Sequence, residues 1–520
     1  MITTHMPAAI RPWMPLFIIL LCAWAFDLLF YDKAIGLNLL LFTALITGGL
    51  IARLGWKNIS SPARITMLGA WVAAFMCVVH HSGISVFMAM VSIGVCSALA
   101  LEAQLRSTLY AVPQLMLNFL WLPVGAWEGT GELMQQRRSA RTGWRWARIT
   151  LLPLLAGIVF FQLYRAGNPK FDQLTAGFLD GLWDVFGDLF EFVFTARMCF
   201  FLFGMAVCGG LLYRFAPNLV LQVEEQFGER LKRLRRRRAH WLAPRAMNPL
   251  ERERRMGMVF LVLVNALLLV VNVIDVNWVW FNFEVPEGFS LKQFVHEGTW
   301  ILIISILLSM HLLLHLFRRN QNFYWKSGSL RLLAYVWIAQ NLVLGISVFL
   351  RNYHYIDFHG LAYLRIGVIA FLFLVLVGLV TLYFKIRDKR SFFWLTRVNA
   401  WAAFALLISM TTVDWDRTIV RYNLGHDNPG EIDIDNYLAM SDRVLPLVYA
   451  NIDLVEAQMA KHRTNAVRWV SYLEPNNFRD ALDAKRDRFL ERYRQQHWQE
   501  RTLADDRTMH VLLAQETAWP

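Results

Sequence analysis

Two neighbouring residues, His296 and Glu297, carry the side chains best suited to acid–base chemistry in this chain. An imidazole beside a carboxylate can exchange a proton with a substrate, so the pair is the catalytic candidate. Both precede the apolar stretch 298–317, where we expect a helix to begin and its free N–H groups to stabilise a carboxylate. The zinc-protease pattern HExxH is absent, because Trp300 occupies the position of its second histidine. The sequence therefore favours a structural role at a helix start over catalysis.

Two histidines in the same apolar stretch, His311 and His315, are the candidates for metal binding. Their spacing of one helical turn places both imidazoles on one helix face, as metal ligands are often placed. No further ligand accompanies them, and His315 stands beside Arg318 near the end of the stretch, as a packed histidine would. We therefore expect a structural role for both residues and no metal or other cofactor.

A larger group of charged and imidazole side chains falls near the ends of apolar stretches. In the topology derived below these ends lie on the outer face of a membrane, where such a group can bind a metal, a proton or an anionic headgroup. Charges at a membrane interface are often structural, and that interpretation is favoured. The residues are His296, Glu297, Arg351, His354, Asp357, His359, Arg365 and Asp414.

A dense run of cations begins at Arg230, between two long apolar stretches. Apolar residues recur every three or four positions from Val223 to Leu234, which predicts an amphipathic helix on the inner leaflet of the membrane. No nucleic-acid-binding fold or base-stacking platform accompanies the run, so anionic lipid headgroups are the expected partner. The residues expected to contact headgroups are Arg233, Arg235, Arg236, Arg237 and Arg238.

The composition indicates that transmembrane helices position these residues. Hydrophobic residues make up 56% of the 520 residues, and several apolar runs are long enough to cross a bilayer, so we expect a polytopic membrane protein. The net charge of +13 divides into +17 before Asp414 and −4 from Asp414 onward. The five cysteines lie in apolar stretches without a CxxC pair, which excludes a disulfide framework or a zinc ribbon.

Loop cations stay in the cytoplasm, and this rule orients the apolar stretches. We expect about eleven transmembrane helices, with the N-terminus in the cytoplasm and the C-terminus outside it. Leu105–Trp127 is expected to be interfacial or re-entrant, because a span there would move a group of arginines outside. The expected spans are 14–31, 34–52, 65–79, 85–103, 149–164, 192–213, 258–274, 298–317, 332–350, 366–384 and 398–413.

The fold class that follows is all-α, a polytopic transmembrane helix bundle with a small helical extracytoplasmic C-terminal domain. Helical periodicity also appears in 442–460 and after Asn477, which is the expected cap of a helix that contains Phe478. The expected parts are N-terminal transmembrane helices in 1–213 with an outer amphipathic helix at 171–191, a basic cytoplasmic loop with an interfacial helix in 214–257, C-terminal transmembrane helices in 258–413 and the outer domain in 414–520.

Several short strings resemble a known family. They are RAGNPKF at 165–171, FVHEG at 294–298, LAYLR at 361–365, DW at 414–415, IVRYNL at 419–424, IDIDNYL at 432–438 and VLP at 444–446. In this order they resemble bacterial polytopic membrane proteins of the domain-of-unknown-function 4173 type and close relatives, over roughly residues 152–446. The resemblance implies the bacterial inner (cytoplasmic) membrane and no particular activity. The matching strings give the candidate binding residues His296, Glu297, Arg365, Arg421, Asn423 and Asp435.

Three classes of function are compatible with the sequence. The leading expectation is a non-enzymatic sensor, scaffold or assembly partner that couples the outer helical domain to the membrane, because both soluble faces are elaborated. Its expected partners are a bilayer with anionic headgroups at the basic loop and a protein at the tail, without nucleic acid. A secondary transporter or lipid-handling protein is the alternative, and a membrane-embedded enzyme using His296 and Glu297 is the third class.

Overall fold

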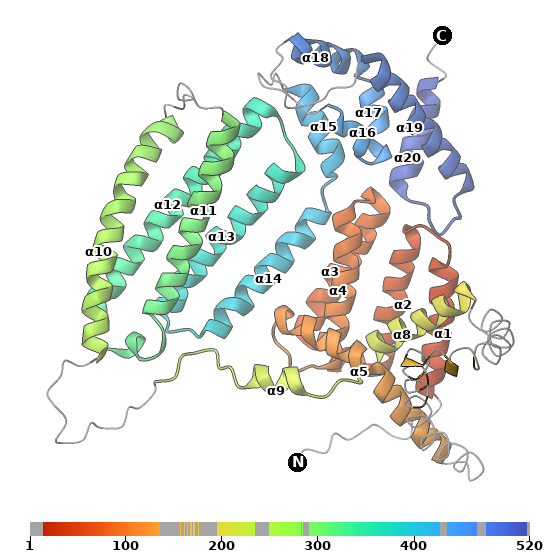
Figure 1. Ribbon diagram of the computed structural model, residues 1–520, viewed down its shortest axis with the longest axis horizontal. Coiled ribbons are helices and arrows are strands. Elements are labelled where there is room, and N and C mark those ends of the chain that lie inside the picture. Colours follow the sequence, from red (N-terminus) through yellow and green to blue (C-terminus); the bar gives the residue numbers. More distant parts are fainter. Residues whose placement is uncertain are drawn as a thin grey trace. The chain divides into compact units, whose positions relative to one another are not determined.

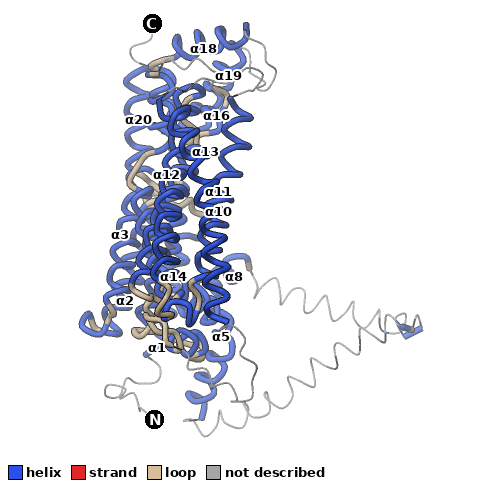
Figure 2. The backbone as a smooth tube through the Cα atoms, turned by 90° about the vertical axis from the view of Figure 1, so that its left-hand side faces the viewer, coloured by secondary structure: helices blue, strands red, loops and turns tan. Residues whose placement is uncertain are grey.

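The computed structural model describes residues 14–135, 195–233, 249–281, 291–426, 434–464 and 475–516, together with Phe283 and single positions between 157 and 175. Figure 2 shows that these residues form helices and connecting loops. Within them the structure contains no strand, and one isolated antiparallel bridge joins Arg230 to Arg390. The predicted all-α fold class is therefore confirmed.

Eight helical segments in the described residues are long and apolar enough to cross a membrane. This confirms the prediction of a multi-spanning membrane protein, whereas the exact number of spans stays a prediction. Two shorter apolar helices, α1 (Met14–Phe30) and α8 (Ala196–Leu212), match two further predicted spans. The eight are α2 (Leu37–Leu54), α3 (Ser61–His80), α4 (Gly83–Leu101), α10 (Pro249–Asp275) with its extension to Phe281, residues 298–316 of α11 (Leu291–Leu316), α12 (Gly328–His359), α13 (Tyr363–Arg387) and α14 (Phe392–Thr411).

The segment expected to be interfacial or re-entrant is helical over most of its length. Helix α5 (Thr108–Gln135) runs through Pro113 and Pro123 without a break, and it is not among the eight candidate spans. Its place relative to the membrane stays a prediction. Apart from single positions, the predicted span 149–164 and the predicted outer amphipathic helix 171–191 lie outside the described residues.

Contacts divide the chain into two compact units, and the first comprises Met1–Trp71, Ala89–Leu105 and Tyr110–Gln222. In this unit α1 packs against α2 and α8. Asp27 of α1 forms an ion pair with Arg197 of α8, with Oδ2 and Nη2 2.9 Å apart. Gly204 allows the close approach of these two helices, because an added Cβ would lie 2.5 Å from the ring of Phe26.

The second unit comprises Val72–Met88, Arg106–Leu109 and Val223–Pro520. In Figure 1 its helix α12 lies between α10 and α11, followed by α13 and α14, and α12 is in contact with α10, α11 and α13. Polar side chains join α10 to α12, as expected for polar groups inside membrane helices. The Nε2 of Gln340 donates to Asn265 Oδ1 at 2.9 Å, and Arg351 Nη2 lies 2.5 Å from Asp275 Oδ1.

Two predicted boundaries of these helices are corrected by the structure. The predicted span 258–274 ends too early, because the aromatic residues after Asp275 form the π-helical turn η2 (Val276–Phe281) that extends α10. The indole Nε1 of Trp280 donates to Ser347 Oγ at 2.9 Å and attaches this turn to α12. Helix α12 also extends to His359, nine residues beyond the predicted span, and Tyr355 in these last turns is buried against Phe283.

The predicted amphipathic helix over 223–234 is wrong for most of its length. Helix α9 (Leu219–Glu225) stops at Glu225, and the chain that follows is extended. Main-chain hydrogen bonds from Leu231 N to Lys389 O and from Ser391 N to Glu229 O hold the extended segment against the α13–α14 turn. These inter-segment bonds replace the local bonds that a helix would have formed.

The tail after α14 consists of short helices that share one apolar core. They are α15 (Trp415–Gly425), α16 (Asn436–Ala439), η4 (Asp442–Val444), α17 (Leu445–Tyr449), α18 (Ile452–Thr464), α19 (Pro475–Gln495) and α20 (Leu503–Glu516). The tail core includes Ile366, in the first turn of α13, so the tail packs on the end of a membrane helix.

Outside the tail, the described residues also contain two short 3-10 turns, η1 (Trp56–Asn58) and η3 (Arg319–Phe323).

Two details of the tail differ from the sequence prediction. Helix α19 begins at Pro475, so Asn477 lies in its first turn and does not cap it, in keeping with the preference for proline at a first helical position. The periodic stretch 442–460 is divided into three helices, because Pro446 starts a new helix there.

Candidate functional site

The connection from α14 to the tail is built around Asp414. This residue caps the N-terminus of α15, with its Oδ1 accepting a hydrogen bond from Arg417 N at 3.4 Å. The Oγ1 of Thr418 donates to the Asp414 carbonyl at 2.7 Å, and Trp415 Nε1 donates to Met410 O at 2.9 Å. A capping aspartate satisfies a free N–H group and complements the helix dipole. The turn between the last membrane helix and the tail is thus fixed by side chains.

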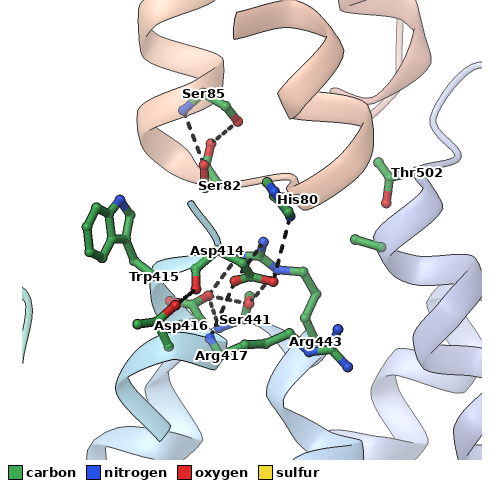
Figure 3. Close-up of polar contacts among 12 residues, drawn as sticks. His80, Ser82, Ser85, Asp414, Trp415, Asp416, Arg417, Ser441, Arg443 and Thr502 are labelled. Atoms are coloured by element: carbon green, nitrogen blue, oxygen red, sulfur yellow. Dashed lines mark hydrogen bonds and ion pairs between the residues drawn. The ribbon is translucent and has the colours of Figure 1, made fainter. Parts of the chain in front are cut away.

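A buried arginine, Arg443 of η4, binds the turn between α14 and α15. Only 4% of its surface is exposed, and its Nη2 lies 2.8 Å from Asp416 Oδ2 while its Nε donates to Ser441 Oγ at 2.9 Å. The hydroxyl of Ser441 donates in turn to Asp416 (Figure 3). The Nη1 of Arg443 lies 3.3 Å from Asp414 Oδ1 but without the alignment of a hydrogen bond. A buried cation is stable only with such partners.

The α3–α4 turn contributes two histidines to the same region. The Nδ1 of His80 lies 3.9 Å from Asp414 Oδ2, and Figure 3 shows this ring directed at the carboxylate. His81 has a φ of +48°, and its Nδ1 is buried without a hydrogen-bond partner in the described part of the chain. Burial lowers the pKa of His81; Asp505 opposes this effect, whereas Arg443 and Arg492 add to it. We call Asp414, Asp416, Ser441, Arg443 and His80 the Asp414 joint.

A cavity of about 490 Å³ lies beside the Asp414 joint. Arg417 and Arg421 line it from one face of α15, since they are one helical turn apart, and Arg507 lines it from α20. Four arginines and one carboxylate therefore line the cavity, which makes it strongly cationic. Its lining residues are Val79, His80, Asp414, Arg417, Thr418, Arg421, Tyr422, Arg443, Ala504, Arg507 and Thr508.

A known protein family matches most of the chain. The family model described as Domain of unknown function (DUF4153) matches residues 16–449. The chain belongs to this family. No curated protein and no solved structure matches it.

The DUF4153 match supports the expected membrane protein family of unknown function, although it does not specifically show the 4173 type named from the sequence. The matched region contains Asp414 and Arg443, whereas Arg507 lies beyond its end at residue 449. The DUF4153 domain and the helices after it therefore both line the cavity.

Of the six binding residues inferred from the resemblance, Arg421 lies in the cavity. Asn423 is buried and braces another loop, since its Oδ1 accepts from Leu361 N at 2.6 Å and its Nδ2 donates to Leu361 O at 3.0 Å. Arg365 binds the same loop through the carbonyls of His359 and Gly360. These two residues therefore have structural contacts that need no ligand.

Of the remaining three, the structure describes one side chain, that of Asp435. Asp435 precedes α16, and it does not line the cavity. His296 and Glu297 lie in the first turns of α11, as expected, but their side chains are outside the description.

The larger group expected on the outer face is divided among separate partners. Arg351 pairs with Asp275, and His354 stacks on Phe283 with ring centroids 4.1 Å apart. Asp357 Oδ1 lies 2.9 Å from the Nε2 of His426. His359 packs against Tyr355, and among the members whose side chains the structure describes, Asp414 lines the cavity.

The metal and lipid candidates remain predictions. In α11 the Nδ1 of His315 lies 3.3 Å from Arg318 Nη1, and no three His, Cys, Asp or Glu side chains gather as metal ligands in the described residues. Arg233 is described at the end of the extended segment, whereas 235–238 fall outside the described ranges.

The sequence prediction missed His80, Arg417, Arg443 and Arg507 as site residues. The one-turn spacing of Arg417 and Arg421 after an acidic cap was a usable signal. The other three come from distant segments that only the folded chain brings together.

Proposed function

We propose that this protein is a non-enzymatic sensor of the bacterial inner membrane, in which the Asp414 joint couples the tail helices to the membrane helices. The observation that carries the proposal is the convergence of three segments on one carboxylate. Asp414 follows α14 and caps α15, and it is approached by Arg443 from η4 and by His80 from the end of α3. A change in the tail that moves Arg443 alters its contact with Asp414. Because Asp414 follows α14 and lies near His80 of α3, the change reaches both the α13–α14 and the α3–α4 hairpins. An element with two arrangements can link distant sites in this way.

The partners predicted from the sequence belong to this proposal. A sensor needs an input surface and an output surface. The tail and the cationic run that begins at Arg230, which we call the basic segment, provide these surfaces at opposite ends of α13. We propose that the tail lies outside the cytoplasm and binds a protein partner there, and that the basic segment contacts anionic headgroups inside.

The other two classes have less support. The enzyme proposal depends on the side chains of His296 and Glu297, for which the structure provides no geometry. The transport proposal depends on the number of spans and on the outer group of charged side chains, and in that group Arg351 is paired with Asp275. This ion pair joins α10 to α12, so helix packing explains it.

Coupling through the joint is tested by hydrogen–deuterium exchange of the full chain in nanodiscs. We expect Asp414→Asn to raise exchange both in the α3–α4 turn (79–88) and around η4 (441–445), because the substitution removes the charge that Arg443 and His80 share. Asp453→Asn in α18 is the matched control, since Asp453 is exposed in the same tail. Faster exchange at 441–445 with an unchanged α3–α4 turn would contradict the proposed coupling.

A further inference from the structure

We propose that the cavity beside the Asp414 joint binds the phosphate group of a small anionic ligand. The site is a separate claim from the coupling role, because binding can be measured whether or not the joint transmits it.

The first argument is uncompensated charge. Within the described residues the guanidinium groups of Arg417, Arg421 and Arg507 form no ion pair, although they line one cavity. Like charges gathered in one place repel each other, and a bound anion removes that cost. Asp414 does not supply the missing charge, because it is engaged by Arg443 and by the N-terminus of α15.

The second argument is an unmet hydrogen-bond donor. Arg443 is 4% exposed, and its Nη1 has an ionic neighbour but no aligned acceptor in the described part of the structure. A buried donor without an acceptor costs free energy. Since Arg443 also lines the cavity, an oxygen of a bound anion is the natural acceptor.

The third argument concerns the type of anion. Each guanidinium presents a planar fork of N–H donors that matches phosphate and carboxylate oxygens. Arginines line this cavity from three separate elements, α15, η4 and α20. A tetrahedral phosphate presents oxygens in several directions, whereas a carboxylate presents two oxygens in one plane. The arrangement therefore favours phosphate.

The fourth argument is size and lining. Pockets for small molecules measure roughly 300–1,000 Å³, and this cavity of about 490 Å³ falls in that range. Val79, Ala504 and the ring of Tyr422 supply apolar surface beside the arginines. Arg421 and Arg507 are exposed, so the cavity opens to solvent on their side. The ligand is therefore a phosphate ester with a small organic part, either free or as a lipid headgroup.

Binding is tested by calorimetry on the full chain in nanodiscs of phosphatidylcholine, with inorganic phosphate and phenyl phosphate as probes and succinate as the carboxylate competitor. We expect phenyl phosphate to bind more tightly than succinate, and the affinity to fall with added salt. Each of Arg417→Gln, Arg421→Gln and Arg507→Gln should weaken binding about tenfold, which is the effect of losing a charge-assisted hydrogen bond.

Arg479→Gln is the matched control, because Arg479 belongs to the same tail and pairs with Glu456 on its surface. Arg507→Gln addresses the risk of misfolding, since Arg507 is exposed and makes no ion pair within the described ranges. Nanodiscs containing phosphatidylglycerol distinguish the two sources of phosphate. If the lipid is the ligand, these discs abolish phenyl phosphate binding to the wild type by competition; if the ligand is free, the affinity for phenyl phosphate is the same in both kinds of disc.

Three results would overturn the proposal: no phosphate probe binds and phosphatidylglycerol has no effect, the arginine variants bind like Arg479→Gln, or succinate binds as tightly as phenyl phosphate. Failure of the coupling test with intact binding of phenyl phosphate would contradict the proposed function alone. Loss of the phosphate site with intact coupling would contradict this inference alone.

Discussion

At the scale of single residues, the Asp414 joint places a buried arginine beside carboxylates that stabilise its charge. Arg443 and Asp416 are both about 5% exposed, so neither charge retains much water. Such a pair contributes modest net stability, but removing one member leaves the other buried and uncompensated. The Asp414 joint is therefore sensitive to substitutions that conserve shape and change charge.

We expect Asp416→Asn to destabilise the tail by about 3 kcal/mol, because Arg443 loses its closest carboxylate in a buried site. Asp487→Asn is the control, since Asp487 is an exposed partner of Arg486 and surface pairs are worth about 0–1 kcal/mol. Urea unfolding followed by tryptophan fluorescence measures both variants. Equal effects of the two substitutions would show that the joint is solvated.

Sequence alone identified some of these residues and could not identify others. Arg421 was found because it stands in a recognisable string, and Asp414 because it follows an apolar stretch. Arg443 and Arg507 carry no local signal, since their role arises from contacts between segments far apart in the chain. The acid–base pair His296 and Glu297 drew attention by composition, which does not reveal what a side chain touches.

At the scale of elements, the apolar stretches of the sequence predicted where the membrane helices lie, but several predicted helix ends were wrong. The α10 extension, the long α12 and the short α9 each depend on contacts with another segment, such as the hydrogen bonds between 229–231 and 389–391. Hydropathy does not contain this information. The α12–α13 loop is a similar case, because Gly360 has a φ of +79° and lies against the side chain of Asn423.

We expect Gly360→Ala to destabilise the protein by about 1–3 kcal/mol, the cost of holding a non-glycine residue in this backbone conformation. An added Cβ would also lie 2.6 Å from Asn423 Oδ1, so the brace on Leu361 must move. Gly367→Ala in α13 is the control, because its added Cβ meets nothing within 4 Å. Thermal unfolding in detergent should show a lower midpoint for Gly360→Ala alone, and equal midpoints would rule out this strain.

At the scale of the second unit, α13 connects the tail to the start of the basic segment. Its first turn packs into the tail core through Ile366, and the turn after its last residue binds Glu229 and Leu231 at the start of the basic segment. A helix of 25 residues is about 37 Å long, which exceeds the roughly 30 Å hydrocarbon core of a bilayer. If α13 spans the membrane, the tail and the basic segment lie on opposite sides of it.

The measurement that tests this arrangement most directly is thiol labelling in intact cells. In a chain with its five cysteines replaced, single cysteines are placed at Trp498 in the tail, which is 61% exposed, and at Trp325 near the basic end, which is 80% exposed. A maleimide that cannot cross the inner membrane should label Trp498→Cys in cells with a permeabilised outer membrane. It should label Trp325→Cys only after the inner membrane is opened. Labelling of both positions from the same side, or the reverse order, would contradict the account.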